Sequence, residues 1–492
     1  MFLNTPTQSQ AKIRSWGSLL VFLILVALWR HEIGANLPLS VDEAYYIAWS
    51  KSIDWGYWTK PPMIAWAIGA ARFFCGETAG CVRFTSLLAF PLTAITLVWL
   101  SCRMGASLGA ACLLGALFAT LPLSSFYGIA ATTDAFLLFF WACAMLSLWL
   151  ALEGKFWAWP ALGVSFGMGM LSKYTMVVFG LSAVLILLHP KWRFAWRTSG
   201  PYLAVMVSLL VFSPNIYWNL KHEMPTFQHT ADISQGGNAY GLHWDALGKF
   251  LVEQVLIGNP LLVIGAVFVL IGQIKKPNHM SWYALSCCLP ILIVISTQAL
   301  LSRAHANWAA PAYVGVCLAA VFHYWPVRKK ILVAALIFNG MFATILYHYQ
   351  SLIAQPFQLS GTIAADPFWA LRPWPEITKT IEQELASHQP DHDAWQIASE
   401  DRAILAQAQA ALNLPAGHAM GWLYGSQPQN HFDQHFPLPL NSLRPVLLVT
   451  RLPDQEVLIK FPNAIKQSEL KVSTPTEKMS YQLWWLGSKL QK

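Results

Sequence analysis

Residues 42–62 read DEAYYIAWSKSIDWGYWTKPP, a polar and aromatic stretch that closely follows an apolar run from about residue 16 to residue 29. Among its ionisable residues, the stretch places a carboxylate pair, Asp42 and Glu43, and the lysine Lys60 beyond the end of a candidate membrane helix. Ionisable side chains are costly inside hydrocarbon, so this group belongs at the water edge of a bilayer. The stretch therefore predicts chemistry at a membrane surface.

The composition of the whole chain is that of a polytopic membrane protein. Of its 492 residues 55% are hydrophobic and only 11% charged, and the mean hydropathy is +0.44, far above that of a soluble globular chain. The formal net charge of +8 raises the alternative of a nucleic-acid partner. Because the basic residues lie in short clusters between apolar runs, we expect membrane lipids around the chain and no nucleic acid.

Apolar segments long enough to cross a bilayer are read in eleven places. They are residues 17–29, 84–101, 106–121, 135–152, 156–170, 176–188, 201–218, 249–271, 281–300, 308–324 and 331–349. The first segment does not resemble a cleavable signal peptide, because no small-residue cleavage site follows it. We expect an all-α membrane domain of about eleven transmembrane helices over residues 1–350.

The loops between these segments predict an orientation. With the N-terminus inside, the inner segments hold 12 Lys or Arg in 47 residues, and the outer segments hold 8 in 109. Lysine and arginine collect on the cytoplasmic side of membrane proteins. We therefore expect a cytoplasmic N-terminus and, with an odd number of spans, an extracytoplasmic C-terminus.

Beyond the last apolar span the composition changes to that of a soluble domain, assigned to residues 351–492. Helices are predicted for 376–388 and 400–412, and strands for 395–399, 420–424, 446–450 and 481–486. We expect a small extracytoplasmic α/β domain.

Two of the eight cysteines, Cys75 and Cys81, lie in the first outer loop. An oxidising compartment would permit a disulfide between them, but a spacing of six is not diagnostic. We favour two free thiols at the lipid edge, and read the other six cysteines as small apolar helix residues.

Further ionisable residues near the predicted outer membrane boundary come from separate segments: Asp134, Lys173, Arg303 and His305. A set of acids and bases on one face favours an active site over a transport path, which needs such groups at mid-membrane. Each has a structural alternative. Asp134 could cap the following helix, Lys173 could snorkel, and Arg303 and His305 could be interfacial anchors, which is the favoured interpretation for His305.

The long outer loop at 219–248 also contains histidines and carboxylates, but their spacing matches no zinc pattern. We interpret it as a solvated loop that covers the site.

Four motifs together resemble the membrane glycosyltransferases of the protein O-mannosyltransferase and lipid A aminoarabinose transferase kind. These are DEAYY at 42–46, KPP at 60–62, TDA at 133–135 and LSKYT at 171–175, and NWAAPAY at 307–313 looks like a pattern of the bacterial members. The resemblance extends over roughly residues 10–325. It is specific for the superfamily and weak for the substrate.

The resemblance implies a C-type glycosyltransferase fold that takes a sugar from a polyprenyl phosphate and passes it to a lipid A, glycan or protein acceptor at the cell envelope. Asp42 would be the general base with Glu43 beside it, and Lys60 would hold the lipid phosphate. We further expect Tyr45, Tyr46, Asp134 and His305 to contact substrate. On family grounds the membrane would be a bacterial inner membrane and the C-terminal domain periplasmic.

The chain departs from the aminoarabinose transferase pattern at Thr59, where that pattern has a glutamate. If that glutamate helps to hold a metal in relatives, Thr59 puts such a metal site in doubt. We therefore expect no cofactor and a metal-independent reaction.

Physical chemistry assigns the same roles independently. Departure of a glycosyl phosphate increases the negative charge on the phosphate, which Lys60, Lys173 and Arg303 would stabilise. A carboxylate within reach accepts the proton of the attacking hydroxyl, and one displacement with one base predicts inversion. The rival interpretations are a transporter or lipid-linked sugar flippase, and a non-catalytic membrane scaffold.

Overall fold

The chain forms two compact units, seen in a computed structural model that describes residues 8–235, 241–359, 366–388, 395–425, 427–439, 444–473 and 478–486. The first unit comprises Met1–Gly34, Lys60–Ile64 and Arg83–Tyr347. The second comprises Ala35–Thr59, Ala65–Val82 and His348–Lys492. The second unit thus combines parts of the first outer loop with the C-terminal region, and each unit is described by itself.

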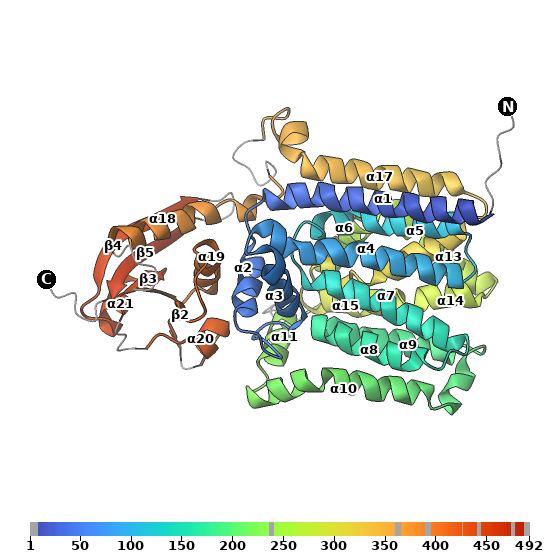
Figure 1. Cartoon of the computed structure of the whole chain (residues 1–492), viewed down its shortest axis with the longest axis horizontal. Coiled ribbons are helices and arrows are strands. Elements are labelled where there is room, and N and C mark those ends of the chain that lie inside the picture. The colour runs from blue at the N-terminus through green and yellow to red at the C-terminus, as the bar shows by residue number, and fades with distance from the viewer. Residues whose placement is uncertain are drawn as a thin grey trace. The chain divides into compact units, whose positions relative to one another are not determined.

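The first unit is helical throughout its ordered elements, as far as the described residues go, and most of its long helices run alongside one another (Figure 1). Its α-helices are α1 (Gln8–Ala35), α4 (Ala79–Arg103), α5 (Leu108–Thr120), α6 (Pro122–Tyr127), α7 (Thr133–Leu152), α8 (Ala158–Ser172), α9 (Val178–Leu188), α10 (Gly200–Lys221), α11 (Pro225–Gln235), α12 (Trp244–Ile257), α13 (Pro260–Lys275), α14 (His279–Ser286), α15 (Leu289–Leu301), α16 (Ala312–Tyr324) and α17 (Lys329–Tyr347), with α1 and α4 reaching into the second unit.

Long apolar helices with exposed apolar side chains make this unit a membrane domain. Six helices of the described chain are long and apolar enough to cross a bilayer, or seven if the bent pair α12 and α13 counts as one, and four shorter apolar helices accompany them. Leu25 on α1, Leu210 on α10 and Met341 on α17 are more than half exposed, which suits contact with lipid. The prediction of a multi-pass membrane protein is confirmed, whereas the count of eleven spans is not.

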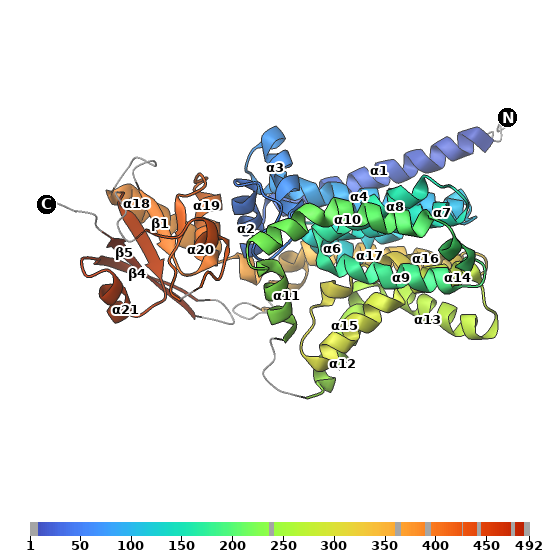
Figure 2. The same ribbon diagram turned by 90° about the horizontal axis from the view of Figure 1, so that it is seen from below.

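The predicted span at 249–271 is broken, and the prediction of one continuous helix is wrong. The chain bends by 106° between α12 and α13 (Figure 2). Gly258 follows α12, and a Cβ atom there would lie 2.0 Å from Cε1 of Tyr313. Asn259, at φ 66°, starts α13 by accepting a hydrogen bond from the backbone N–H of Leu261 at 2.9 Å. The bend therefore results from a close contact and a left-handed residue directly before a proline.

Glycines allow α8 and α10 to pack closely. A Cβ atom at Gly163 would lie 2.5 Å from the carbonyl oxygen of Ala204, and one at Gly167 would lie 2.7 Å from Cβ of Val211. Small residues four apart let membrane helices approach backbone to backbone. α8 is thereby held against α10 along the segment that leads to Lys173.

The C-terminal part of the second unit is a five-stranded sheet with the order β2-β1-β3-β5-β4. The strands are β1 (Gln396–Ser399), β2 (Ala419–Gly421), β3 (Val446–Thr450), β4 (Ile465–Ser473) and β5 (Lys478–Leu486). β1 pairs in parallel with β2 and β3, while β5 is antiparallel to β3 and β4. The expected α/β fold is confirmed.

Helices pack on the sheet of this unit (Figure 1). They are α18 (Trp374–His388), α19 (Arg402–Ala411), α20 (His431–His435) and α21 (Asp454–Lys460). On one side Trp485 of β5 donates a hydrogen bond to Glu384 of α18 at 3.3 Å, and on the other Val457 of α21 belongs to a core cluster with Trp484. The sheet is therefore buried on both faces.

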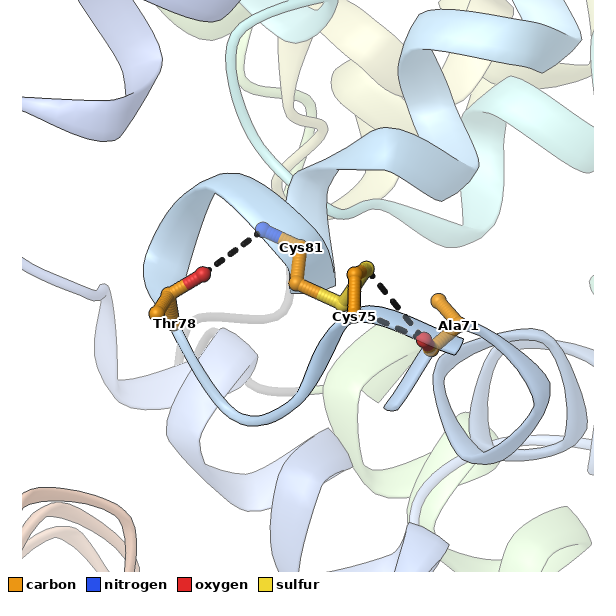
Figure 3. The surroundings of a disulfide bond; sticks show 4 residues. All are labelled: Ala71, Cys75, Thr78 and Cys81. Carbon is orange, nitrogen blue, oxygen red and sulfur yellow. Dashed lines mark hydrogen bonds between the residues drawn. A yellow bond between two sulfur atoms is a disulfide. The ribbon is translucent and has the colours of Figure 1, made fainter. Parts of the chain in front are cut away.

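The outer-loop part of this unit contains α2 (Val41–Ser50), most of α3 (Met63–Cys75) and a disulfide between Cys75 and Cys81, with Cα atoms 5.7 Å apart. The expectation of free thiols is therefore wrong. Figure 3 shows how a short turn brings the two residues together, with Thr78 accepting a hydrogen bond from the N–H of Cys81 at 3.2 Å. This bond caps the start of α4 and holds Cys81 within reach of Cys75.

Candidate active site

Asp134 and Lys173 form a buried ion pair in the first unit. Nζ of Lys173 lies 2.7 Å from Oδ1 of Asp134, and their side chains are 12% and 5% exposed. The amide of Asn307 donates to Oδ2 of Asp134 at 2.8 Å. Both carboxylate oxygens therefore have partners, as a buried charge requires. Asp134 lies in the first turn of α7, but Thr132 is the N-cap, so the alternative that Asp134 caps this helix does not hold.

Cationic residues gather around His305, in the turn before α16. Partial burial, and then the charges of Arg303, Lys173 and Lys60, lower the pKa of His305, while Glu253 opposes them. All four charged groups therefore lie close enough to act on one imidazole. Lys60, Lys173 and Arg303 thus act on the same imidazole, and their binding of a donor phosphate stays a prediction.

Glu253, on α12, is a site residue that the sequence reasoning overlooked. Its carboxylate acts electrostatically on both His305 and Tyr127, and Asp134 acts on the same tyrosine. Its side chain is 33% exposed, and Oε1 lies 4.0 Å from Nζ of Lys249. A second acidic group therefore stands near the cations, contributed by the bent pair of helices.

Hydrogen bonds attach α12 to the turn that carries His305. The Tyr313 hydroxyl of α16 donates to the Gln254 carbonyl at 2.7 Å, and the Gln254 amide donates to the Ala306 carbonyl at 3.0 Å. These bonds fix the backbone on either side of the turn. The position of Glu253 relative to His305 is thus set by main-chain contacts rather than by an exposed loop.

The remaining predicted residues lie in the second unit, where Asp42 and Glu43 have different surroundings. Asp42 is 61% exposed, and its Oδ1 lies 3.6 Å from a guanidinium nitrogen of Arg402. Glu43 is buried and forms a capping box with Ser40, whose backbone N–H donates to Oε2 of Glu43 at 2.9 Å. Asp42 is therefore available to solvent and substrate, while Glu43 stabilises the start of α2.

Tyr45 and Tyr46 are both buried. The hydroxyl of Tyr45 accepts a hydrogen bond from the backbone N–H of His431 at 2.6 Å. The Tyr46 ring packs against Trp49, with centroids 5.1 Å apart. Tyr45 therefore joins α2 to the C-terminal domain, a contact that no local sequence pattern indicates.

A second charged group joins the disulfide turn to the same domain. Lys51 lies 3.0 Å from Glu77, which also pairs with Arg72, and it donates to the Asn413 side chain at 3.0 Å. Burial, and then the charge of Arg72, lowers the pKa of Lys51 to about 8. Glu77 lies inside the loop that the Cys75 disulfide closes, so the disulfide holds it in place.

The described residues include no group of three or more His, Cys, Asp or Glu side chains that could hold a metal ion. Thr59, at the position of the glutamate in the aminoarabinose transferase pattern, is buried. Metal independence stays a prediction.

A family model described as dolichyl-phosphate-mannose-protein mannosyltransferase matches residues 59–218. A lipid A galacturonosyltransferase of Rhizobium johnstonii is 28% identical over 450 residues, 88% of this chain and 90% of that protein. An undecaprenyl phosphate-alpha-4-amino-4-deoxy-L-arabinose arabinosyl transferase of Erwinia tasmaniensis is 26% identical over 222 residues, 43% of this chain and 39% of that protein.

Among solved structures, ArnT from Cupriavidus metallidurans bound to undecaprenyl phosphate has a TM-score of 0.69 and 16% identity, over 96% of this chain and 99% of that one. The fold is therefore that of the C-type membrane glycosyltransferases. The resemblance inferred from the sequence motifs is confirmed. The similarity to the galacturonosyltransferase runs along most of both chains, whereas the similarity to the Erwinia arabinosyl transferase covers under half of each.

Proposed function

We propose that the protein is an integral membrane glycosyltransferase that transfers a sugar from a polyprenyl-phosphate donor to a lipid A acceptor. The observation that carries the proposal is the buried Lys173–Asp134 ion pair in a membrane domain, near His305, on which the charges of Lys60 and Arg303 also act. The fold supports it, because the similar ArnT structure contains bound undecaprenyl phosphate. The acceptor follows the similar galacturonosyltransferase, whose name specifies lipid A.

The cations would bind the phosphate of the donor. When the bond between C1 of the sugar and the phosphate oxygen breaks, the phosphate gains negative charge. Fixed cations then stabilise the transition state more than the ground state. Because Lys173 is paired with Asp134, we assign the direct phosphate contacts to Lys60 and Arg303 and a supporting role to Lys173.

Asp42 would be the general base. The acceptor hydroxyl oxygen attacks C1, its proton passes to the Asp42 carboxylate, and polyprenyl phosphate leaves with the electrons of the broken bond. A base must have a free oxygen, and Asp42 is 61% exposed. A single displacement of this kind inverts the anomeric centre. A trapped glycosyl-enzyme adduct would contradict this assignment.

We propose that the N-terminus is cytoplasmic and that residues 351–492 form an extracytoplasmic domain, beside a membrane catalytic domain at 1–350. The disulfide between Cys75 and Cys81 supports this topology, because disulfides persist in oxidising compartments and both cysteines belong to the loop that is predicted to be outside. In a bacterium that compartment is the periplasm. Labelling of single cysteines from either side of the inner membrane tests the orientation.

The test of the function is sugar transfer by purified protein in lipid. Polyprenyl phosphates that carry galacturonic acid, 4-amino-4-deoxy-L-arabinose or mannose would be offered with lipid A, comparing wild type with Asp42→Asn and Lys60→Ala. We expect transfer from one donor and roughly a hundredfold or greater loss in each variant. A chelator arm tests metal dependence, because loss of activity that a divalent ion restores would contradict metal independence.

Matched controls separate this function from transport. Lys471→Ala removes a cation of β4 that is 72% exposed, and it should leave transfer unchanged. Absence of transfer from every donor, together with uptake of a lipid-linked sugar into vesicles, would replace the enzyme by a flippase. Wild-type transfer by Asp42→Asn would remove Asp42 as the base.

A further inference from the structure

We propose that Arg402, in the C-terminal domain, is a positioning residue for Asp42. This inference rests on the proposed role of Asp42 as the general base. Arg402 is the first residue of α19, and its guanidinium nitrogen lies 3.6 Å from Oδ1 of Asp42 in the first turn of α2. The two residues belong to the same compact unit although they are far apart in the chain. The soluble domain thereby reaches the side chain assigned to proton transfer.

The guanidinium also contacts the ring of Tyr45, which lies three residues after Asp42 on α2. Its central carbon lies 4.9 Å from the centroid of the Tyr45 ring, a distance typical of a cation–π contact. The ring cannot move freely, because Tyr45 is buried and its hydroxyl accepts the hydrogen bond from the His431 backbone. Arg402 therefore has two contacts with α2, one with the Tyr45 ring and one with the Asp42 carboxylate.

The backbone of Arg402 is fixed as well. Asp401 caps α19, with Oδ1 accepting a hydrogen bond from the N–H of Ala403 at 2.8 Å. Oδ2 of Asp401 accepts a hydrogen bond from the Tyr481 hydroxyl at 3.1 Å. Tyr481 lies on β5, so the sheet determines where α19 begins. The position of the guanidinium thus depends on the folded domain and not only on local helix geometry.

The distance from Arg402 to Asp42 suits a base. At 3.6 Å the contact is longer than a normal N–H···O hydrogen bond, so it orients the carboxylate by charge without occupying a lone pair. Glu43 differs, because one of its oxygens accepts the Ser40 hydrogen bond that closes the capping box. Of the two neighbouring carboxylates, Asp42 is thus oriented but exposed, whereas Glu43 stabilises the helix start.

Two further hydrogen bonds join α19 and the turn after it to the residues on either side of α2. The Gln407 amide donates to the Leu39 carbonyl at 3.0 Å, before α2, and Lys51, at its end, donates to the Leu414 carbonyl at 2.8 Å. Together with the contact of Arg402 to Asp42 in the first turn of α2, these bonds attach α2 at its start and at its end. The C-terminal domain is therefore a platform that sets the position of the proposed base.

The test compares Arg402→Gln, Arg402→Lys and the control Lys466→Ala in the transfer assay. Lys466, on β4 of the same domain, pairs with Asp454 of α21 at 3.0 Å. We expect Arg402→Gln to remain folded, because the side chain is 37% exposed. Its kcat should fall roughly ten- to a hundredfold, as expected for a misplaced catalytic group, with little change in the KM for donor. Arg402→Lys should recover part of the rate, and Lys466→Ala should match wild type.

A double variant distinguishes positioning from general stabilisation. If Arg402 acts through Asp42, adding Arg402→Gln to Asp42→Asn should lower the residual rate little further. A folded Arg402→Gln with the wild-type rate, a multiplicative loss in the double variant, or an Arg402→Lys no better than Arg402→Gln would each overturn the inference. The proposed function fails separately, when the wild-type protein transfers sugar from none of the donors. Wild-type transfer by Asp42→Asn would instead remove Asp42 as the base, and with it the positioning role of Arg402.

Discussion

Nζ of Lys173 lies 2.7 Å from Oδ1 of Asp134, although the two residues are 39 positions apart and lie at the end of one helix and the start of another. The extended backbone at Lys173 turns the chain from α8 into the next helical segment and delivers the ammonium to the first turn of α7. A carboxylate is favourable at a helix N-terminus and a cation at a helix C-terminus, so Asp134 at the start of α7 and Lys173 at the end of α8 each suit the helix end that carries them. This pair fixes the ends of two helices beside the cation cluster.

Loss of one member of this pair should be costly. Lys173→Ala leaves the Asp134 carboxylate buried with only the Asn307 hydrogen bond, and we expect a loss of about 3 kcal/mol in the free energy of unfolding. Thermal unfolding in detergent measures it. Lys249→Ala is the control, with less than about 0.5 kcal/mol. Asp134→Asn with Lys173→Met should recover part of the loss, and equal stability of Lys173→Ala and the control would show that the pair is not buried.

Two of the cations that act on His305, Lys60 and Arg303, should each contribute strongly to transfer. Lys60→Ala and Arg303→Ala each remove a proposed phosphate contact, so kcat/KM for donor should fall roughly a hundredfold. Lys60→Arg keeps the charge and should retain more activity than Lys60→Ala. Steady-state rates with the identified donor measure these effects. If Arg303→Ala transfers at the wild-type rate, Arg303 is an interfacial anchor, the alternative that its sequence position allows.

The stability of the second unit should depend on pH through His431. Burial, and then the proximity of His435, hold the pKa of His431 well below its usual range, so the folded state keeps this imidazole neutral. The unfolded chain binds a proton below about pH 6.5, so the stability of the fold should fall as pH drops through that value. The slope approaches about 1.4 kcal/mol per pH unit. In His431→Gln the unfolding temperature between pH 7.5 and 5.5 should change less than in wild type; an equal change would assign the effect to other groups.

Removal of the disulfide should loosen the turn between α3 and α4. A loop of six residues closed by a disulfide contributes about 2 kcal/mol through the unfolded state. Replacing Cys75 and Cys81 by serine should cost that amount. Dithiothreitol should lower the unfolding temperature of wild type and leave the serine variant unchanged. If dithiothreitol lowered the unfolding temperature of both proteins equally, the effect would not be due to this disulfide.

Much of the membrane domain could be predicted because the thickness of a bilayer sets a length that apolar runs must match. The bend between α12 and α13 could not be predicted in this way, because an apolar run has the same composition whether the helix is straight or bent. The Gly258-Asn259-Pro260 tripeptide was the available signal, because each of these residues punctuates helices. In the C-terminal domain, β4 was overlooked for a related reason: it is an edge strand whose charged residues give no apolar alternation.

The site divides in the same way. Lys60, Lys173 and Arg303 could be expected to approach one another because topology alone places their segments on one side of the membrane. Asn307, Glu253 and Arg402 were not assigned, since each acquires its role from a contact with a residue far away in the chain. Arg402 in particular follows an N-cap aspartate, so the sequence explains its neighbour as a helix start and gives no indication of Asp42.

The hydrogen bond between Tyr45 and His431 joins residues 386 positions apart. At about 5–20 residues per second, synthesis of the intervening chain takes roughly 20 to 80 s. During that interval α2 exists without the C-terminal domain, and its buried Tyr45 lacks the hydrogen bond from His431 and the ring contact with Phe432. The enzyme is therefore assembled in a set order, with membrane insertion first. The proposed base is held in place only when the last part of the chain has been made.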